Sequence, residues 1–187
     1  MAGENDIIAQ YGRLVDYCTA FWNQVAGVVG GQISCKKGCS ICCELTSVNY
    51  LEARLIADHC MKHPEALVAP GRPRVPPPDQ EGSCPFITAR ACRIYAVRPL
   101  ICRTHGLLLR GESFREPVVP SCPYNFVETD FDSVDTALVL DIEKISDNLA
   151  RLNAAYCLAR GDIKKASERV MLKELAEGPA GLPRISA

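Results

Sequence analysis

The sequence predicts a mainly α-helical protein, in which a helical shell surrounds an irregular cysteine-rich centre with at most a small β-hairpin. Two segments carry this prediction, because apolar residues recur every three or four positions over 5–28 and over 132–159. The cysteine-rich segment between them, residues 35–125, shows no sustained period. We expect a single domain over 1–187, since this length is sufficient for one hydrophobic core.

The N-terminal third is predicted to contain two helices. The first covers residues 5–28, where Asn5 or Asp6 can cap the start. The second covers residues 48–62, with Ser47 as its N-cap. Each helix has apolar residues on one side, so each is expected to pack one face against the core.

The middle of the chain is predicted to be poor in regular structure. Residues 64–82 contain six prolines and two glycines, which favours a loop. Pro99 suits the first turn of a short helix that carries Leu100 to Arg103. Four short segments favour β-structure, and the last two suit a hairpin: 86–88, 93–95, 107–109 and 117–119.

The C-terminal region, residues 132–176, is predicted to flank the cysteine-rich module with two more helices. The first covers 132–159, and its apolar stripe begins with Val134 and Leu138. Gly161 is expected to end it. The second covers 162–176.

Composition excludes several classes of protein. Of all residues, 48% are apolar and 23% are charged, and the net charge is −1, which argues against nucleic-acid binding driven by overall charge. Apolar runs are too short to span a membrane. The acidic N-terminus lacks the features of a secretory signal, so we expect a cytoplasmic protein.

The most informative feature is a series of eight ordered cysteines among the eleven in the chain. Four thiols lie within nine residues, and thiolates so close together repel unless they are protonated, oxidised or bound to a metal cation. The reducing cytoplasm and the odd number of cysteines both favour metal binding over disulfide bonds. The candidate metal ligands are Cys35, Cys39, Cys42, Cys43, Cys84, Cys92, Cys102 and Cys122.

Alternatives remain open within this series. Residues 35–43 could form a helix that buries its cysteines as small hydrophobic residues, although Gly38 and Ser40 disfavour it. The side chains of Cys42 and Cys43 diverge in most conformations, so the pair indicates two metal sites, one polynuclear cluster, or one residue that is not a ligand. Cys39-x2-Cys42 has the spacing of a metal-binding knuckle.

Other residues complete the set of candidates. Residues 84–122 contain six arginines but only two acidic residues. The arginines could offset the negative charge of thiolates, or they could form a solvated basic face. His105 is either a ligand or structural, and His59 and His63 are expected at the surface. The cysteines outside the series are expected in the core: Cys18, Cys60 and Cys157.

These residues resemble the YkgJ-type cysteine-cluster family, also called the CxxCxxCC zinc- or iron-chelating domain. The resemblance rests on Cys-Lys-Lys-Gly-Cys-Ser-Ile-Cys-Cys, Cys-Pro-Phe, the string Ile-Tyr-Ala-Val-Arg-Pro-Leu-Ile-Cys-Arg and the final Cys122. It covers about 35–125 and implies that the eight cysteines bind metal. Three residues separate Cys35 from Cys39, whereas the family pattern has two residues between these cysteines.

Three functional hypotheses follow. The first is a metal-binding protein that holds zinc, or iron as ions or as an iron–sulfur cluster. The second is an enzyme, with catalytic residues unknown. Cys35-x3-Cys39-x2-Cys42 is similar to the motif of radical S-adenosylmethionine enzymes, but too few residues follow for their barrel. Flagellin lysine N-methylases are similar over the cysteine module, yet no nucleoside-binding glycine loop is present. The third is a zinc-stapled module that binds a protein partner.

Overall fold

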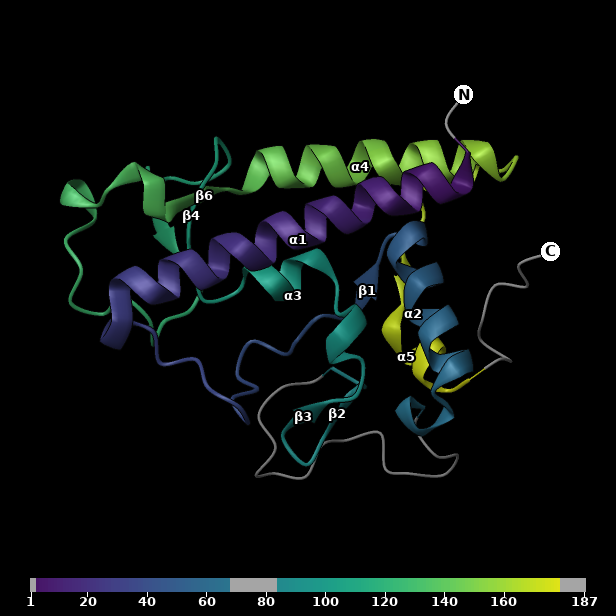
Figure 1. Cartoon of the computed structure of the whole chain (residues 1–187), viewed down its shortest axis with the longest axis horizontal. Coiled ribbons are helices and arrows are strands. Elements are labelled where there is room, and N and C mark those ends of the chain that lie inside the picture. Colours follow the sequence, from purple (N-terminus) through teal and green to yellow (C-terminus); the bar gives the residue numbers. More distant parts are fainter. Residues whose placement is uncertain (1–2, 68–83, 179–187) are drawn as a thin grey trace. The chain divides into compact units, whose positions relative to one another are not determined.

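The computed structural model describes residues 3–67 and 84–178 (Figure 1). These residues divide between two compact units. The first unit comprises Met1–Lys36 and Leu100–Ala155, and the second comprises Lys37–Pro99 and Tyr156–Ala187. Helices predominate, as expected. Three small sheets are present where at most one hairpin was predicted.

The first unit is built on a long helix, α1 (Glu4–Val29). It begins after Gly3, whose N–H donates to the Asp6 carboxylate at 3.3 Å, so the predicted cap at Asn5 or Asp6 was wrong by two or three residues. Its buried residues are Ile7, Tyr11, Cys18 and Val25, and they lie along one stripe. This side packs against the short predicted helix, α3 (Leu100–Thr104) (Figure 1).

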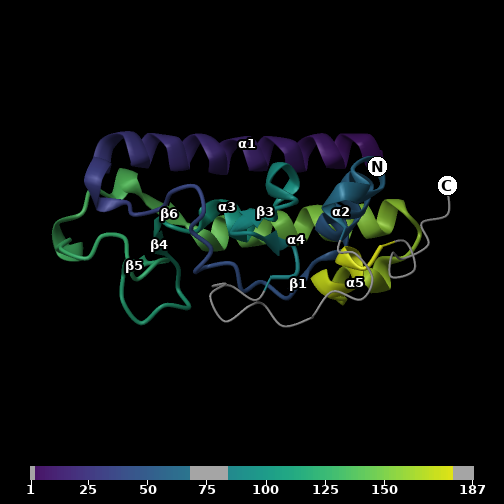
Figure 2. The same cartoon turned by 90° about the horizontal axis from the view of Figure 1, so that it is seen from below.

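A three-stranded sheet completes the first unit, with β4 (Leu108–Arg110) between β5 (Val119–Pro120) and β6 (Val139–Asp141) (Figure 2). The β4–β5 pair is the predicted hairpin, in which Leu109 lies opposite Val119. Strand β6 pairs with β4 in parallel, with Leu140 opposite Leu109. This third strand was not predicted.

The predicted helix over 132–159 begins ten residues later, as α4 (Ile142–Ala159). The carboxylates of Asp130 and Asp135 accept hydrogen bonds from the N–H groups two residues on, which stabilises turns instead of a helix. Val139 and Leu140 are buried in β6, and this burial outweighs their helical spacing. Asp141 then accepts a hydrogen bond from the N–H of Lys144 at 3.1 Å, which caps the start of α4.

In the second unit, α2 (Tyr50–Lys62) packs against α5 (Leu172–Ala176). Asn49 is the N-cap, because its side chain accepts from the N–H of Glu52 at 2.9 Å. The predicted cap, Ser47, instead belongs to β1 (Ser47–Val48), which pairs antiparallel with β7 (Val170–Met171). The core comprises Val48, Ala53, Ile56, Ala57, Cys60, Ala66, Phe86, Ile94, Leu172, Leu175 and Ala176.

Strand β7 interrupts the helix predicted over 162–176. Ile163–Ser167 form a 3-10 helix, β7 follows, and only α5 is α-helical. The N–H of Leu172 donates to the carbonyl of Thr46 at 2.8 Å, so pairing with β1 determines this conformation.

A two-stranded hairpin, β2 (Ile87–Thr88) and β3 (Ala91–Cys92), completes the second unit. Ala89 and Arg90 both have positive φ, of 49° and 58°, as a type I′ hairpin turn requires. The prediction of β-structure over 93–95 was wrong, because Tyr95–Val97 form a 3-10 helix. Of the loop predicted over 64–82, Pro64–Ala66 form a 3-10 turn, and the part from 68 lies outside the described residues. In the described ranges, no helix is both long and apolar enough to cross a membrane.

Candidate metal centre

Five of the eight candidate cysteines belong to the second unit, and three of them lie in one turn. Gly38 has a φ of +92°, which glycine adopts at little cost. The N–H of Cys43 then donates to the carbonyl of Ser40 at 3.0 Å. The turn therefore holds Cys39, Cys42 and Cys43 close together, and the proposed helix over 35–43 is not formed.

Backbone hydrogen bonds place Cys84 and Cys92 beside this turn. The N–H of Cys84 donates to the carbonyl of Cys43 at 2.8 Å. The N–H of Ile87 donates to the carbonyl of Cys84 at 3.1 Å, and Ile87 lies opposite Cys92 in the β2–β3 ladder. Cys42, Cys84 and Cys92 thus all lie close enough to Cys43 for their charges to raise its pKa.

Two of these sulfurs receive hydrogen bonds from the backbone. The N–H of Phe86 donates to Cys84, and the N–H of Ile94 donates to Cys92, and each bond lowers the pKa of the thiol. In both cases the donor lies two residues after the cysteine. An N–H directed at sulfur favours the thiolate, the form that binds metal, and orients it.

Burial opposes this effect. Burial raises the pKa of Cys84 to about 11, and it also raises the pKa of Cys92. The positive charge of Arg98 partly offsets the rise at Cys92. The pKa of Cys43 is raised first by its hydrogen bond with Cys42, then by burial and by the charges of Cys42, Cys84 and Cys92. Without a cation these thiols hold their protons at neutral pH, so metal binding would release protons.

The other three candidate cysteines belong to the first unit, where Asn125 is the central residue. Asn125 is only 2% exposed. Its side chain donates to the carbonyl of Gly106 at 2.8 Å and accepts from the N–H of Ser34 at 2.9 Å. The same Nδ2 lies 3.4 Å from the sulfur of Cys35, so a buried amide positions this thiol.

Asn125 also connects Cys35 to Cys122. Its backbone N–H donates to the carbonyl of Cys122 at 3.2 Å, and Cys122 is buried. Cys102 is half-buried on α3. Gly106 has a φ of +94°, and a Cβ there would lie 3.0 Å from the Cys35 sulfur, so a larger residue would strain the backbone and crowd this thiol.

The sulfurs gather without forming a completed ligand cage. All eleven cysteines lie within the described ranges, and none is in a disulfide. In the same ranges, no group of three or more histidine, cysteine or acidic side chains has a metal-binding arrangement. The assignment of all eight cysteines as ligands, and their grouping, therefore stay predictions.

The arginines of residues 84–122 differ in role. Arg98 lies beside Cys92, as thiolate neutralisation requires, and also stacks on the Tyr95 ring at 3.8 Å. Arg90 and Arg93 instead donate to backbone carbonyls, Arg90 to Gly38 at 3.1 Å and Arg93 to Leu67 at 2.8 Å. Arg103 is buried, and its charge acts on Cys18. Arg98 thus matches the predicted electrostatic role at a candidate ligand.

The remaining sequence candidates are placed clearly. Cys18, Cys60 and Cys157 are at most 1% exposed, as predicted. His105 has its Nδ1 3.0 Å from the carbonyl of Ile101, and since a carbonyl only accepts, this nitrogen donates. His59 was expected at the surface but is half-buried beside a cavity.

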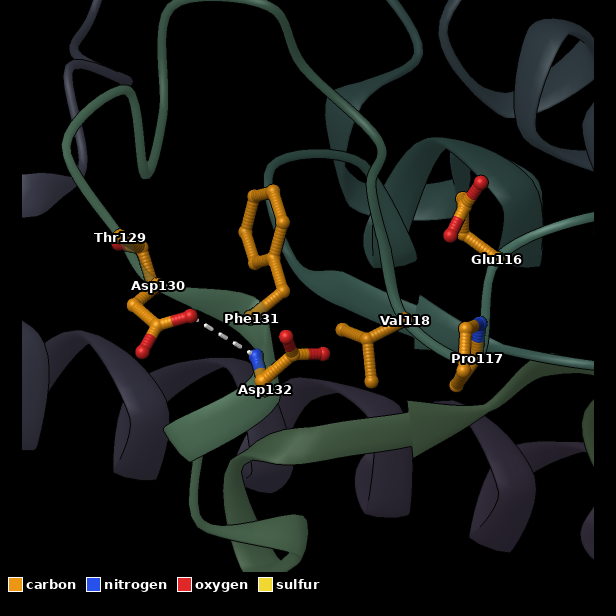
Figure 3. Close-up of a pocket in the computed structure, with 7 residues that line it drawn as sticks. All are labelled: Glu116, Pro117, Val118, Thr129, Asp130, Phe131 and Asp132. Atoms are coloured by element: carbon orange, nitrogen blue, oxygen red, sulfur yellow. Dashed lines mark hydrogen bonds between the residues drawn. The ribbon is translucent and has the colours of Figure 1, made fainter.

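Two cavities lie outside the cysteine turn. One, of about 380 Å³, lies in the first unit, where Phe131 lies between Asp130 and Val118 (Figure 3). Its Asp130 carboxylate accepts from the N–H of Asp132, so it stabilises its own turn. The other, of about 290 Å³, lies in the second unit and is lined by His59, His63, Glu65, Ala66, Cys92, Arg93, Tyr95 and Ala96.

Comparison with known proteins identifies one family. Residues 34–123 match the model of the CxxCxxCC family, described as a putative zinc- or iron-chelating domain. The match includes all eight cysteines of the series and agrees with the resemblance seen in the sequence. Neither the curated proteins nor the solved structures include a significant match to the chain.

Proposed function

We propose that the protein binds zinc or iron through clustered cysteine thiolates, because residues 34–123 match the model of the CxxCxxCC family of zinc- or iron-chelating domains. The observation that carries the proposal is the meeting of Cys42, Cys43, Cys84 and Cys92 beside one turn. Cys39 lies in the same turn and is the fifth candidate there.

The donor set fits such a cation. Sulfur-rich sites bind both Zn²⁺ and iron, including iron in clusters. The N–H groups directed at Cys84 and Cys92 stabilise thiolates, and Arg98 adds a positive charge beside Cys92. When bound, the cation would supply the positive charge that allows several neighbouring thiols to ionise together.

The first unit contributes a separate set of candidates. Cys35, Cys102 and Cys122 lie there, and the Asn125 amide orients Cys35 as an outer hydrogen-bond donor orients a metal ligand. We assign all three as ligands on the strength of the family pattern. Such a chain suits a reducing compartment, and we place it in the cytoplasm. In residues 3–67 and 84–178, nothing favours the methyltransferase or protein-interaction alternatives, and neither is proposed.

The test is to produce the full chain without oxygen and to measure zinc, iron and acid-labile sulfide per chain. Zinc or iron in at least equimolar amount supports the proposal, and sulfide with iron identifies a cluster. A reduced, folded chain that retains neither metal, even after incubation with each, would exclude it.

A further inference from the structure

His59 and His63 lie one helical turn apart at the end of α2, where His63 is the C-cap. Their ring centroids are 4.5 Å apart, with 33° between the ring planes. Two histidines spaced by four residues on one helix face can bind a single cation, as they do in zinc-binding helices. The spacing and the facing rings are therefore the first requirements of a metal site.

The hydrogen bonding of His63 meets a second requirement. Its Nδ1 lies 3.2 Å from the carboxylate of Glu65, and since a carboxylate only accepts, Nδ1 donates, which leaves the lone pair of the neutral ring on Nε2. A carboxylate bonded to the second ring nitrogen is the usual partner of a metal-ligating histidine, because it fixes the tautomer and the ring orientation.

The rings also face a space large enough for a hydrated cation. Both histidines line the cavity of about 290 Å³, together with Glu65 and Cys92. Arg93 lines it too, and its positive charge opposes a cation. Its guanidinium is held by the carbonyls of Glu65 and Leu67, at 2.6 and 2.8 Å, and by the Thr88 hydroxyl. These bonds also hold the Glu65 segment beside the β2–β3 hairpin.

We propose that His59 and His63 form a second, weaker metal site for a borderline divalent cation such as Zn²⁺ or Ni²⁺. Two imidazoles supply the protein ligands, and water completes the coordination. Cys92, on the wall of the same cavity, is the nearest link to the thiolate cluster. The site does not depend on the proposed function, because it uses none of the eight cysteines as a required ligand.

The experiment follows the imidazole ring signals by nuclear magnetic resonance while Zn²⁺ is added to the reduced full chain, after its tighter sites have been filled with Zn²⁺ and the excess has been removed. The chain has three histidines, so His105 is an internal control. We expect the His59 and His63 signals to shift together and saturate at one equivalent, while the His105 signals stay in place. Shifts of all three rings, or of neither His59 nor His63, would overturn the proposal.

Variants make the test specific. The double variant His59→Gln/His63→Gln should lose at least about tenfold in affinity for the added Zn²⁺, and Glu65→Gln about tenfold, the usual effect of removing an outer partner. His105→Gln should bind Zn²⁺ as the wild type does. Wild-type affinity in the double variant would contradict the proposal, and so would loss of the tightly bound metal there, because the histidines would then belong to the thiolate site. If the cysteines retain no Zn²⁺ after this filling step, the same titration and variants test the histidine site, because no tighter site then competes for the added ion.

Discussion

The backbone N–H of Cys84 donates a hydrogen bond of 2.8 Å to the carbonyl oxygen of Cys43, so two cysteines separated by a proline-rich segment are neighbours in the fold. This bond joins the turn of residues 39–43 to the β2–β3 hairpin, which carries Cys92. Backbone hydrogen bonds therefore bring these cysteines near one another in the fold.

Loss of a cluster thiol should remove metal. Cys84→Ser and Cys92→Ser each delete a sulfur that receives a backbone hydrogen bond. Removing a group that only hydrogen-bonds a metal ligand lowers metal affinity by ~10–100-fold, so we expect a larger loss of metal affinity when the ligand itself is removed. Cys39→Ser and Cys42→Ser should also lower metal content. Metal per chain measures the effect, and Cys157→Ser, outside the cluster, should leave it unchanged. Equal losses in all five variants would show that the ligands are wrongly assigned.

Asn125→Ala should destabilise the chain by about 1–3 kcal/mol, because it leaves the buried carbonyl of Gly106 without its donor and removes the acceptor of the Ser34 N–H. Urea unfolding of the metal-free chain measures the change. Asn148→Ala is the matched control, since Asn148 is exposed and bonds only within its helix, and it should change stability by less than about 0.5 kcal/mol. A similar effect at both positions would refute the positioning role of Asn125.

Three glycine-to-alanine variants separate backbone strain from steric crowding. Gly106→Ala should cost the most, because it adds contacts of 3.0 and 3.1 Å with Cys35 and Asn125 to a φ of +94°. Gly161→Ala has a φ of +75° with open space around it, so it should cost only about 1 kcal/mol. Gly27→Ala lies within α1 with no contact nearby and should stabilise by roughly 0.5–1 kcal/mol. Thermal unfolding would reveal the order, and a smaller cost at Gly106 than at Gly161 would contradict the crowding.

Cys18 predicts a dependence of stability on alkaline pH. Burial raises its pKa from 9.0 to about 11, although the charge of Arg103 opposes the rise. A pKa raised in the folded state gives stability that is complete below pH 9 and is lost as pH rises towards 11. The loss amounts to roughly 2 kcal/mol for a shift of this size. Between pH 8.5 and 11, we expect the free energy of unfolding in urea to fall by roughly 2 kcal/mol more for the wild type than for Cys18→Ala. If the two proteins lose the same free energy over this range, the raised pKa is not that of Cys18.

Local sequence signals predicted the elements whose conformation depends on nearby residues. Helix α1 and helix α3 lie where periodicity and Pro99 place them, and β4 pairs with β5 as the hairpin signal indicated. Tertiary pairing determined the rest. Strand β6 forms because β4 offers a free edge to Val139 and Leu140, although their helical spacing predicted a longer α4.

The candidate site shows the same division. The order of the cysteines and the family resemblance singled out eight candidate ligands, but neither carried a signal for Asn125, which acts through a buried amide far along the chain. The backbone N–H groups of Phe86 and Ile94 have no side-chain signature either. The i, i+4 spacing of His59 and His63 was visible in the sequence, but the cavity beside them comes from the packing of residues 92–96 and 65–66.

X-ray absorption at the metal edge of the anaerobically prepared, metal-loaded chain tests most directly whether cysteine sulfurs surround a cation. We predict a first shell dominated by sulfur at about 2.3 Å, and a smaller sulfur shell in Cys84→Ser and Cys92→Ser. A first shell of only nitrogen and oxygen near 2.0–2.2 Å, unchanged in both variants, would contradict it.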